Sequence, residues 1–177
     1  MRAFEIFRTI SPSLGDEIIR SLREHQREVY RAALATLAQQ KKLRPQFVQK
    51  KTTDQQITWI LETLKFKTSD TVAEQILQVW LMKQQSPMLV QFLDAVDVGH
   101  DGAGAVDDLP KELETDKVKT AIDGLLGNFP AESVAVYLQI FQLQQPGGWP
   151  AVAEVLAQDP RLQLGVGTVE AGVKSVE

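Results

Sequence analysis

Residues 53–93 (TDQQITWILETLKFKTSDTVAEQILQVWLMKQQSPMLVQFL) and residues 115–156 (TDKVKTAIDGLLGNFPAESVAVYLQIFQLQQPGGWPAVAEVL) align with each other at an offset of 62 residues. Eight of the first 29 aligned pairs are identical. The identical pairs include Thr53/Thr115, Asp54/Asp116, Ile60/Ile122, Val72/Val134 and Ala73/Ala135. Self-similarity at a fixed period is the sequence signature of repeat proteins, and a unit of this length predicts three helices. We therefore expect an internal duplication of residues 53–97 and 115–158.

Each of the two stretches predicts the same three helices. The first carries apolar residues such as Ile57, Ile60 and Leu64 on one helical face. The second, from about residue 70 and again from Pro130, is apolar nearly all round, which predicts a helix in the middle of a core. The third starts with Ser86-Pro87 and with Trp149-Pro150, and Pro is favoured in the first helical turn.

The N-terminal quarter of the chain gives a different pattern. Apolar residues alternate over residues 4–10, which predicts a short strand or an extended arm. Ser11-Pro12 then begins a stripe of apolar residues that predicts one long helix over residues 13–40. The short segment PQFVQKK, which opens at Pro45, predicts a further helix.

These elements predict an all-α fold with seven to eight helices in a repeat-like bundle, comprising the two similar three-helix units and the long N-terminal helix. We expect one helical domain at residues 1–164, with an acidic, Gly-rich linker at 97–110. Three glycines in residues 165–177 make a stable helix unfavourable there, so we expect a flexible or docked tail.

The composition is that of an ordinary globular chain. Of its 177 residues, 44% are hydrophobic and 24% are charged, which is enough apolar content for a sizeable core. Cysteine is absent, so a disulfide framework, a thiol nucleophile and a thiolate metal site are excluded. The first ten residues lack the apolar run of a signal peptide, and no stretch has the length of a membrane span. We therefore expect a cytoplasmic protein without a membrane partner.

The net charge of −4 hides a strong asymmetry along the chain. Residues 1–52 carry eleven Lys/Arg against five Asp/Glu, hence +6, and residues 53–177 carry eight against eighteen, hence −10. Four arginines repeat at helical spacing and so share one face: Arg20, Arg23, Arg27 and Arg31. Such a stripe can bind an anionic partner or a second copy of the chain, although it can also be an ordinary solvated face.

Nucleic-acid binding through this stripe, with Lys41 and Lys42, is a further alternative. Interleaved acidic residues and a pI near 5.3 make it the less favoured one. Among the three tryptophans, Trp59 lies beside an apolar stripe rather than within a helix that is apolar all round, so it is the better candidate for an interface anchor.

The acidic linker contains a partial calcium-loop pattern. Asp97, Asp101 and Asp108 fall at ligand positions, Gly102 falls at the turning position, and His100 lies between them. Gly99 stands where another ligand belongs, and Pro110 follows where the exiting helix should run. The alternatives are a flexible linker, which the departures favour, and a metal site at Asp97, His100, Asp101 and Asp108, with calcium as the cofactor.

The catalytic motifs are missing. The sequence contains no nucleophile elbow, no phosphate-binding Gly-Lys-Ser/Thr loop and no dinucleotide-binding fingerprint. We therefore expect a helical interaction protein without enzymatic activity, one that binds another protein or itself through Arg20, Arg23, Arg27, Arg31 and Trp59. A metal-binding module, or a metal-dependent enzyme, built on the calcium-like loop is the alternative.

Overall fold

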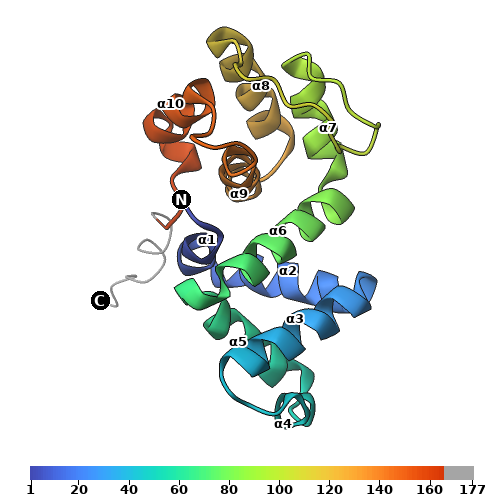
Figure 1. Cartoon of the computed structure of the whole chain (residues 1–177). Coiled ribbons are helices and arrows are strands. Elements are labelled where there is room, and N and C mark those ends of the chain that lie inside the picture. Colours follow the sequence, from blue (N-terminus) through green and yellow to red (C-terminus); the bar gives the residue numbers. More distant parts are fainter. Residues whose placement is uncertain (166–177) are drawn as a thin grey trace, which may run out of the picture.

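The protein consists of two groups of helices joined by a central helix, as the computed structural model of the chain shows (Figure 1). The structure describes residues 1–165; of the tail expected at 165–177, only Gly165 falls within them. In chain order the elements are α1 (Ala3–Thr9), α2 (Pro12–His25), α3 (Arg27–Gln40), α4 (Pro45–Gln49), α5 (Thr53–Leu64), η1 (Lys67–Ser69), α6 (Asp70–Gln84), α7 (Ser86–Ala95), α8 (Thr115–Asn128), α9 (Ala131–Gln142), α10 (Pro150–Gln158) and η2 (Pro160–Leu162). Residues 1–165 contain no β-strand, so the all-α prediction is confirmed.

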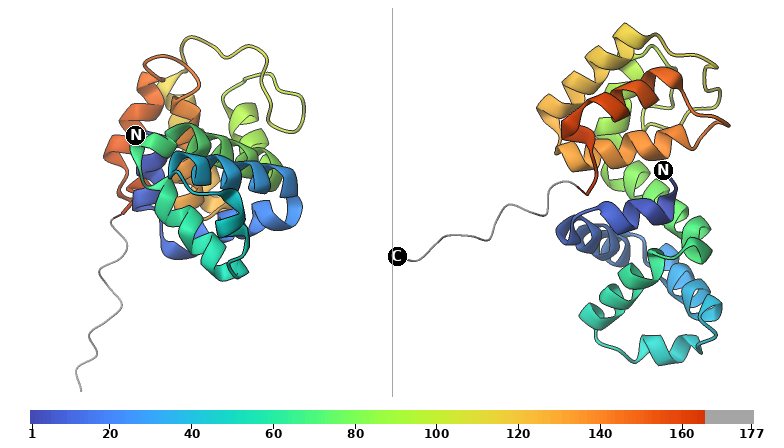
Figure 2. Two further views of the ribbon diagram at one scale, coloured as in Figure 1. Left: turned by 60° about the horizontal axis from the view of Figure 1, so that its bottom comes forward. Right: turned by 90° about the vertical axis from the view of Figure 1, so that its left-hand side faces the viewer.

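The central helix α6 packs against α1, α2, α3 and α5 on the N-terminal side and against α7 and α9 on the C-terminal side. The two groups, α1–α5 and α7–α10, lie one above the other in the right-hand view of Figure 2. The core residues Ile76, Leu77 and Trp80 of α6 are almost fully buried. In α9, six consecutive residues from Ser133 to Leu138 are buried. Both helices that the sequence marks as apolar nearly all round therefore lie in the core.

Residues 4–10 were predicted to form a strand or an extended arm, and this is wrong, because residues 4–9 belong to α1 and Ile10 is its C-cap. The alternation coexists with a helical pattern, since Ala3, Ile6, Phe7 and Ile10 also stand at i, i+3, i+4 and i+7 and are all buried. A seven-residue helix is unstable alone and needs tertiary support. That support comes from packing on α6 and from Asp70, whose carboxylate accepts hydrogen bonds from the Arg2 side chain and the Phe4 main chain.

The single long helix predicted over 13–40 is also wrong. The chain breaks at Gln26, with φ −133° and ψ 55°, so that α2 and α3 are separate helices. A straight helix over 13–40 would be about 42 Å long and would carry its second half past the core. With the break, α2 and α3 both pack against α5 and α6. Residues 1–165 contain ten α-helices, whereas the sequence predicted seven to eight. The additional helices result from this break and from α1.

The order of helices is the same in the two aligned stretches, but their packing differs. In the second stretch α8, α9 and α10 all pack on one another. In the first stretch α6 packs with both neighbours, and α7 packs closely against α8 of the other stretch. The duplication therefore stays a prediction from the sequence.

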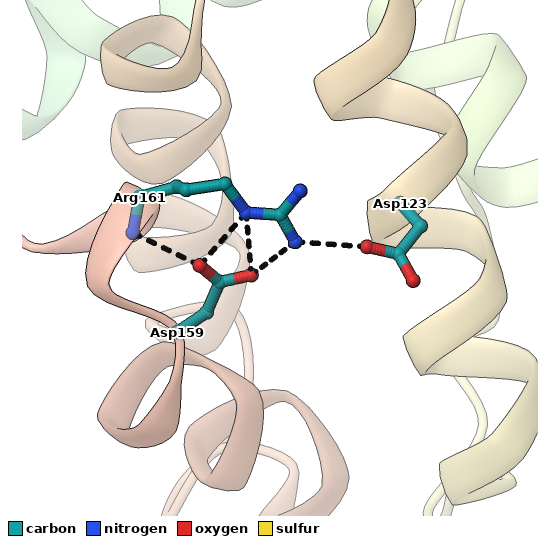
Figure 3. Close-up of polar contacts among 3 residues, drawn as sticks. All are labelled: Asp123, Asp159 and Arg161. Carbon is teal, nitrogen blue, oxygen red and sulfur yellow. Dashed lines mark hydrogen bonds and ion pairs between the residues drawn. The ribbon is translucent and has the colours of Figure 1, made fainter.

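Two polar clusters fix the C-terminal group. Glu132, in the first turn of α9, accepts hydrogen bonds from the main-chain N–H and the hydroxyl of Ser11, which caps α2. Figure 3 shows Arg161 of η2 donating to both carboxylate oxygens of Asp159 and, at 2.9 Å, to Asp123 of α8. The first cluster ties α9 to the N-terminal group, and the second ties the end of α10 to α8.

Candidate partner-binding cleft

Three of the four predicted arginines line one cleft where α2 and α3 meet. Arg23 comes from the last turns of α2, and Arg27 and Arg31 come from the first turns of α3. The cleft has a volume of about 710 Å³. The break at Gln26 therefore places a cationic surface at the corner between two helices rather than along the side of one.

These three guanidinium groups are not paired with any acidic side chain of the described residues. Across residues 1–165, Arg23, Arg27 and Arg31 make no ion pair and no side-chain hydrogen bond, and all three are exposed. Of the residues that line the cleft, Glu24 alone is acidic. The cleft therefore keeps a positive potential that a ligand can neutralise.

Arg20 lies outside this cleft. Its guanidinium donates to Asp16 at 2.6 Å and to Asp54 of α5 at 2.8 Å. These hydrogen bonds and charges raise the pKa of Arg20 above its ordinary value. Arg20 thus clamps α2 to α5, and its charge is already balanced.

The floor of the cleft is a fixed hydrogen-bond network. Tyr30 is 7% exposed, and its hydroxyl donates to Gln56 Oε1 at 2.9 Å. Gln56 Nε2 in turn donates to the carbonyls of Gln49, at 3.1 Å, and Lys51, at 3.0 Å. Burial raises the pKa of Tyr30, and the charge of Arg23 offsets part of that rise. The network ties α3, which carries Arg27 and Arg31, to α5 and to the end of α4.

The sequence-based reasoning missed Tyr30 and Gln56. A signal for Tyr30 was present, because Arg27, Tyr30, Arg31 and Leu34 stand at i, i+3, i+4 and i+7 and all line the cleft. Gln56 comes from α5, which is distant in sequence, so the spacing of residues along α3 cannot indicate its contribution to the cleft. In the middle of α4, Phe47 is 60% exposed, and the ammonium of Lys51 lies 5.3 Å from its ring centroid.

Trp59 does not join this site. It is half-buried against the hydrophobic core and does not line the cleft. Trp80 and Trp149 are 1% and 0% exposed, so both belong to the core.

The residues of the calcium-like loop make contacts within the protein. Asp97 accepts from Lys117 at 2.6 Å, and Asp101 Oδ1 accepts from the main-chain N–H groups of Ala103, at 2.8 Å, and Ala105, at 3.0 Å. These main-chain hydrogen bonds lower the pKa of Asp101.

His100 is held by two hydrogen bonds in the same loop. Its Nδ1 accepts from Gly102 N at 3.0 Å, so its Nε2 carries the proton that is donated to Asp94 at 2.9 Å. In the described part of the chain, no three His, Asp or Glu side chains lie close enough to hold a metal ion together. Calcium needs six to eight oxygen ligands, so a site at Asp97, His100, Asp101 and Asp108 would require rearrangement, and it stays a prediction.

No protein-family model matches the chain, and neither the curated proteins nor the solved structures contain a match to it. None of the helices within residues 1–165 has both the length and the apolar character needed to cross a membrane.

Proposed function

We propose that this chain is a helical interaction protein without enzymatic activity, and that it binds an acidic segment of a protein partner in the cleft formed by Arg23, Arg27 and Arg31. The observation that carries the proposal is the absence, within residues 1–165, of any ion pair to these three arginines, whereas Arg20, on α2 with Arg23, has two. A guanidinium is the side chain best suited to bidentate contact with a carboxylate. An unpaired cluster of guanidiniums is therefore suited to an external carboxylate ligand.

The fold supports the same proposal. We propose that α5–α7 and α8–α10 descend from one duplicated unit, and helical units of this kind make extended binding surfaces. Phe47 does not line the cleft, but it stands two residues before Gln49, which does, and its exposed ring offers an apolar contact to the same partner. The partner would be a cytoplasmic protein, or a second copy of this chain presenting its acidic residues 94–116.

Affinity capture from the native lysate tests the proposal with two matched variants. The first variant carries Arg23→Glu, Arg27→Glu and Arg31→Glu. The control carries Lys41→Glu, Lys42→Glu and Arg44→Glu, which makes the same change in net charge at exposed positions that do not line the cleft. Circular dichroism checks that both variants remain helical.

We expect a defined partner to be captured by the wild type and the control and lost from the cleft variant. Each exposed ion pair contributes about 0.2–1 kcal/mol, so reversing three charges lowers the affinity by about tenfold or more. Added salt should weaken the complex, because it screens exposed charges. Equal capture by all three proteins would refute the proposal, and equal loss from both variants would indicate diffuse attraction, as for a nucleic acid.

Sedimentation of the purified chain distinguishes the two kinds of partner. Self-association at low ionic strength that is lost in the cleft variant would identify a second copy as the ligand. A monomer under all conditions would assign the cleft to a different protein.

A further inference from the structure

A second cavity lies in the C-terminal group, away from the arginine cleft. It has a volume of about 300 Å³ and is bounded by α6, α7, α9 and the loop that joins α7 to α8. Its walls are mainly aliphatic and aromatic, with Leu81, Leu89, Leu93, Val106, Ile140 and Phe141 as the main contributors. None of the lining residues carries a charge. The chemistry of this cavity is therefore that of a small apolar ligand site.

One polar group in this cavity has no partner. Tyr137 of α9 lines the cavity and is 4% exposed, and its hydroxyl makes no hydrogen bond to any of residues 1–165. Its ring is fixed by edge contact with Phe92, at a centroid distance of 5.5 Å, and by Phe141 at 6.0 Å. Buried tyrosine hydroxyls usually have a hydrogen-bond partner, and here no group of residues 1–165 takes that place.

The Tyr137 hydroxyl is not completely sealed inside the protein. The unpartnered side-chain atoms that are wholly enclosed in residues 1–165 are Ser21 Oγ and Trp80 Nε1, and the Tyr137 hydroxyl is not among them. Burial raises the pKa of Tyr137, so the phenol stays protonated and keeps its donor at neutral pH. The donor is therefore available to a molecule that enters.

The outer wall of the cavity is held in place. Ser86 at the start of α7 donates to the carbonyl of Ala103 at 2.7 Å, and Asp101 accepts from the N–H groups of Ala103 and Ala105. Gly104 lies so close to Leu89 that a Cβ there would stand 2.7 Å from the Leu89 Cβ. The loop therefore forms a fixed wall, and the cavity exists before a ligand binds.

We propose that this cavity binds a small, uncharged, mainly apolar molecule that carries one hydrogen-bond acceptor, such as a ketone, which accepts from the Tyr137 hydroxyl. An apolar cavity of about 150 Å³ holds benzene, so this larger one suits about ten to fifteen non-hydrogen atoms. The proposal is independent of the arginine cleft, which lies in the other group of helices.

Two probes of the same shape test it by ligand-observed NMR titration of the full chain. Benzylacetone has an aromatic ring and a ketone, and isopentylbenzene replaces the ketone oxygen with a methyl group. The variants are Tyr137→Phe, which removes the hydroxyl and keeps the ring, and Val106→Trp, which fills the cavity from a partly buried loop position.

We expect the wild type to bind both probes and Val106→Trp to bind neither. Tyr137→Phe should weaken benzylacetone by about three- to tenfold, the range of one net hydrogen bond, and should leave isopentylbenzene unchanged or bound more tightly. Three results would each overturn the proposal: no binding of either probe to the wild type, binding that survives Val106→Trp, or equal effects of Tyr137→Phe on the two probes. Circular dichroism of each variant ensures that a loss of binding is not a loss of folding.

Discussion

Gly104 lies in the loop between α7 and α8, and replacing it with alanine should destabilise the protein for two separable reasons. Its φ is +98°, and a Cβ at this position would lie 2.7 Å from Leu89 Cβ and 3.0 Å from Leu89 Cδ2. The nearest atom is a Cβ on the helix α7, so no rotamer change of Leu89 relieves the contact. The loop itself must move away from the helix.

Gly102 provides the matched control within the same loop. Its φ is +86°, but a Cβ there would meet nothing within 4 Å. Placing an L-residue in this left-handed region lowers the stability by about 1–2 kcal/mol. The lower conformational entropy of the unfolded chain offsets about 0.4–1 kcal/mol of this loss. Gly102→Ala should therefore cost about 1 kcal/mol.

Gly104→Ala should cost more, because overpacking adds about 1–3 kcal/mol to the same backbone term. A gap of about 2 kcal/mol between the two variants corresponds to about 4–8 °C in Tm for a chain of this size. Equilibrium urea unfolding followed by circular dichroism measures the gap directly. If the two variants lose the same stability, the loop does not pack on Leu89 as described, and the inference that this loop forms a fixed wall of the cavity is wrong.

Two further predictions concern the C-terminal group. Trp149 is fully buried, stacks on Phe141 at a centroid distance of 4.4 Å and donates its Nε1–H to Pro110 O at 2.8 Å. Trp149→Ala should therefore lower the free energy of unfolding in urea by about 3–5 kcal/mol, and Trp149→Phe should lower it clearly less because it keeps the stacking. Equal losses in the two variants would contradict this interpretation. Hydrogen bonds from Arg161 lower the pKa of Asp159 below its ordinary value of 3.8, so the stabilisation from this carboxylate is complete above that value and is lost as the pH falls through the folded-state pKa. The difference in Tm between the wild type and Asp159→Asn should therefore be constant near neutral pH and shrink in acid, and a difference independent of pH would show that the charge of Asp159 does not contribute.

Much of the secondary structure follows from local signals in the sequence. Ser11-Pro12, Ser86-Pro87 and Trp149-Pro150 each mark the start of a helix, because Pro has no N–H to lose in the first turn. The two helices that are apolar all round, α6 and α9, are central in the structure. The errors occur where two patterns coexist, as in residues 4–10, or where no Gly or Pro marks a break, as at Gln26.

The candidate sites were likewise predictable only where they depend on residues close together in sequence. Helical spacing alone indicated that Arg23, Arg27 and Arg31 share a surface, and the structure brings them into one cleft. The same spacing included Arg20, whose two carboxylate partners come from its own helix and from a helix 34 residues away. The cavity at Tyr137 had no signal in the sequence, because its walls come from α6, α7, α9 and a loop.

The sequence by itself determined the helical class, most helix starts, the buried central helices and the charge asymmetry, because these depend on residues within one or two turns of each other. Only the tertiary structure decided where the long N-terminal segment breaks, which arginines stay unpaired and which hydroxyl lacks a partner. Those features depend on contacts between side chains distant in sequence, and each contact is set by packing that no local spacing encodes.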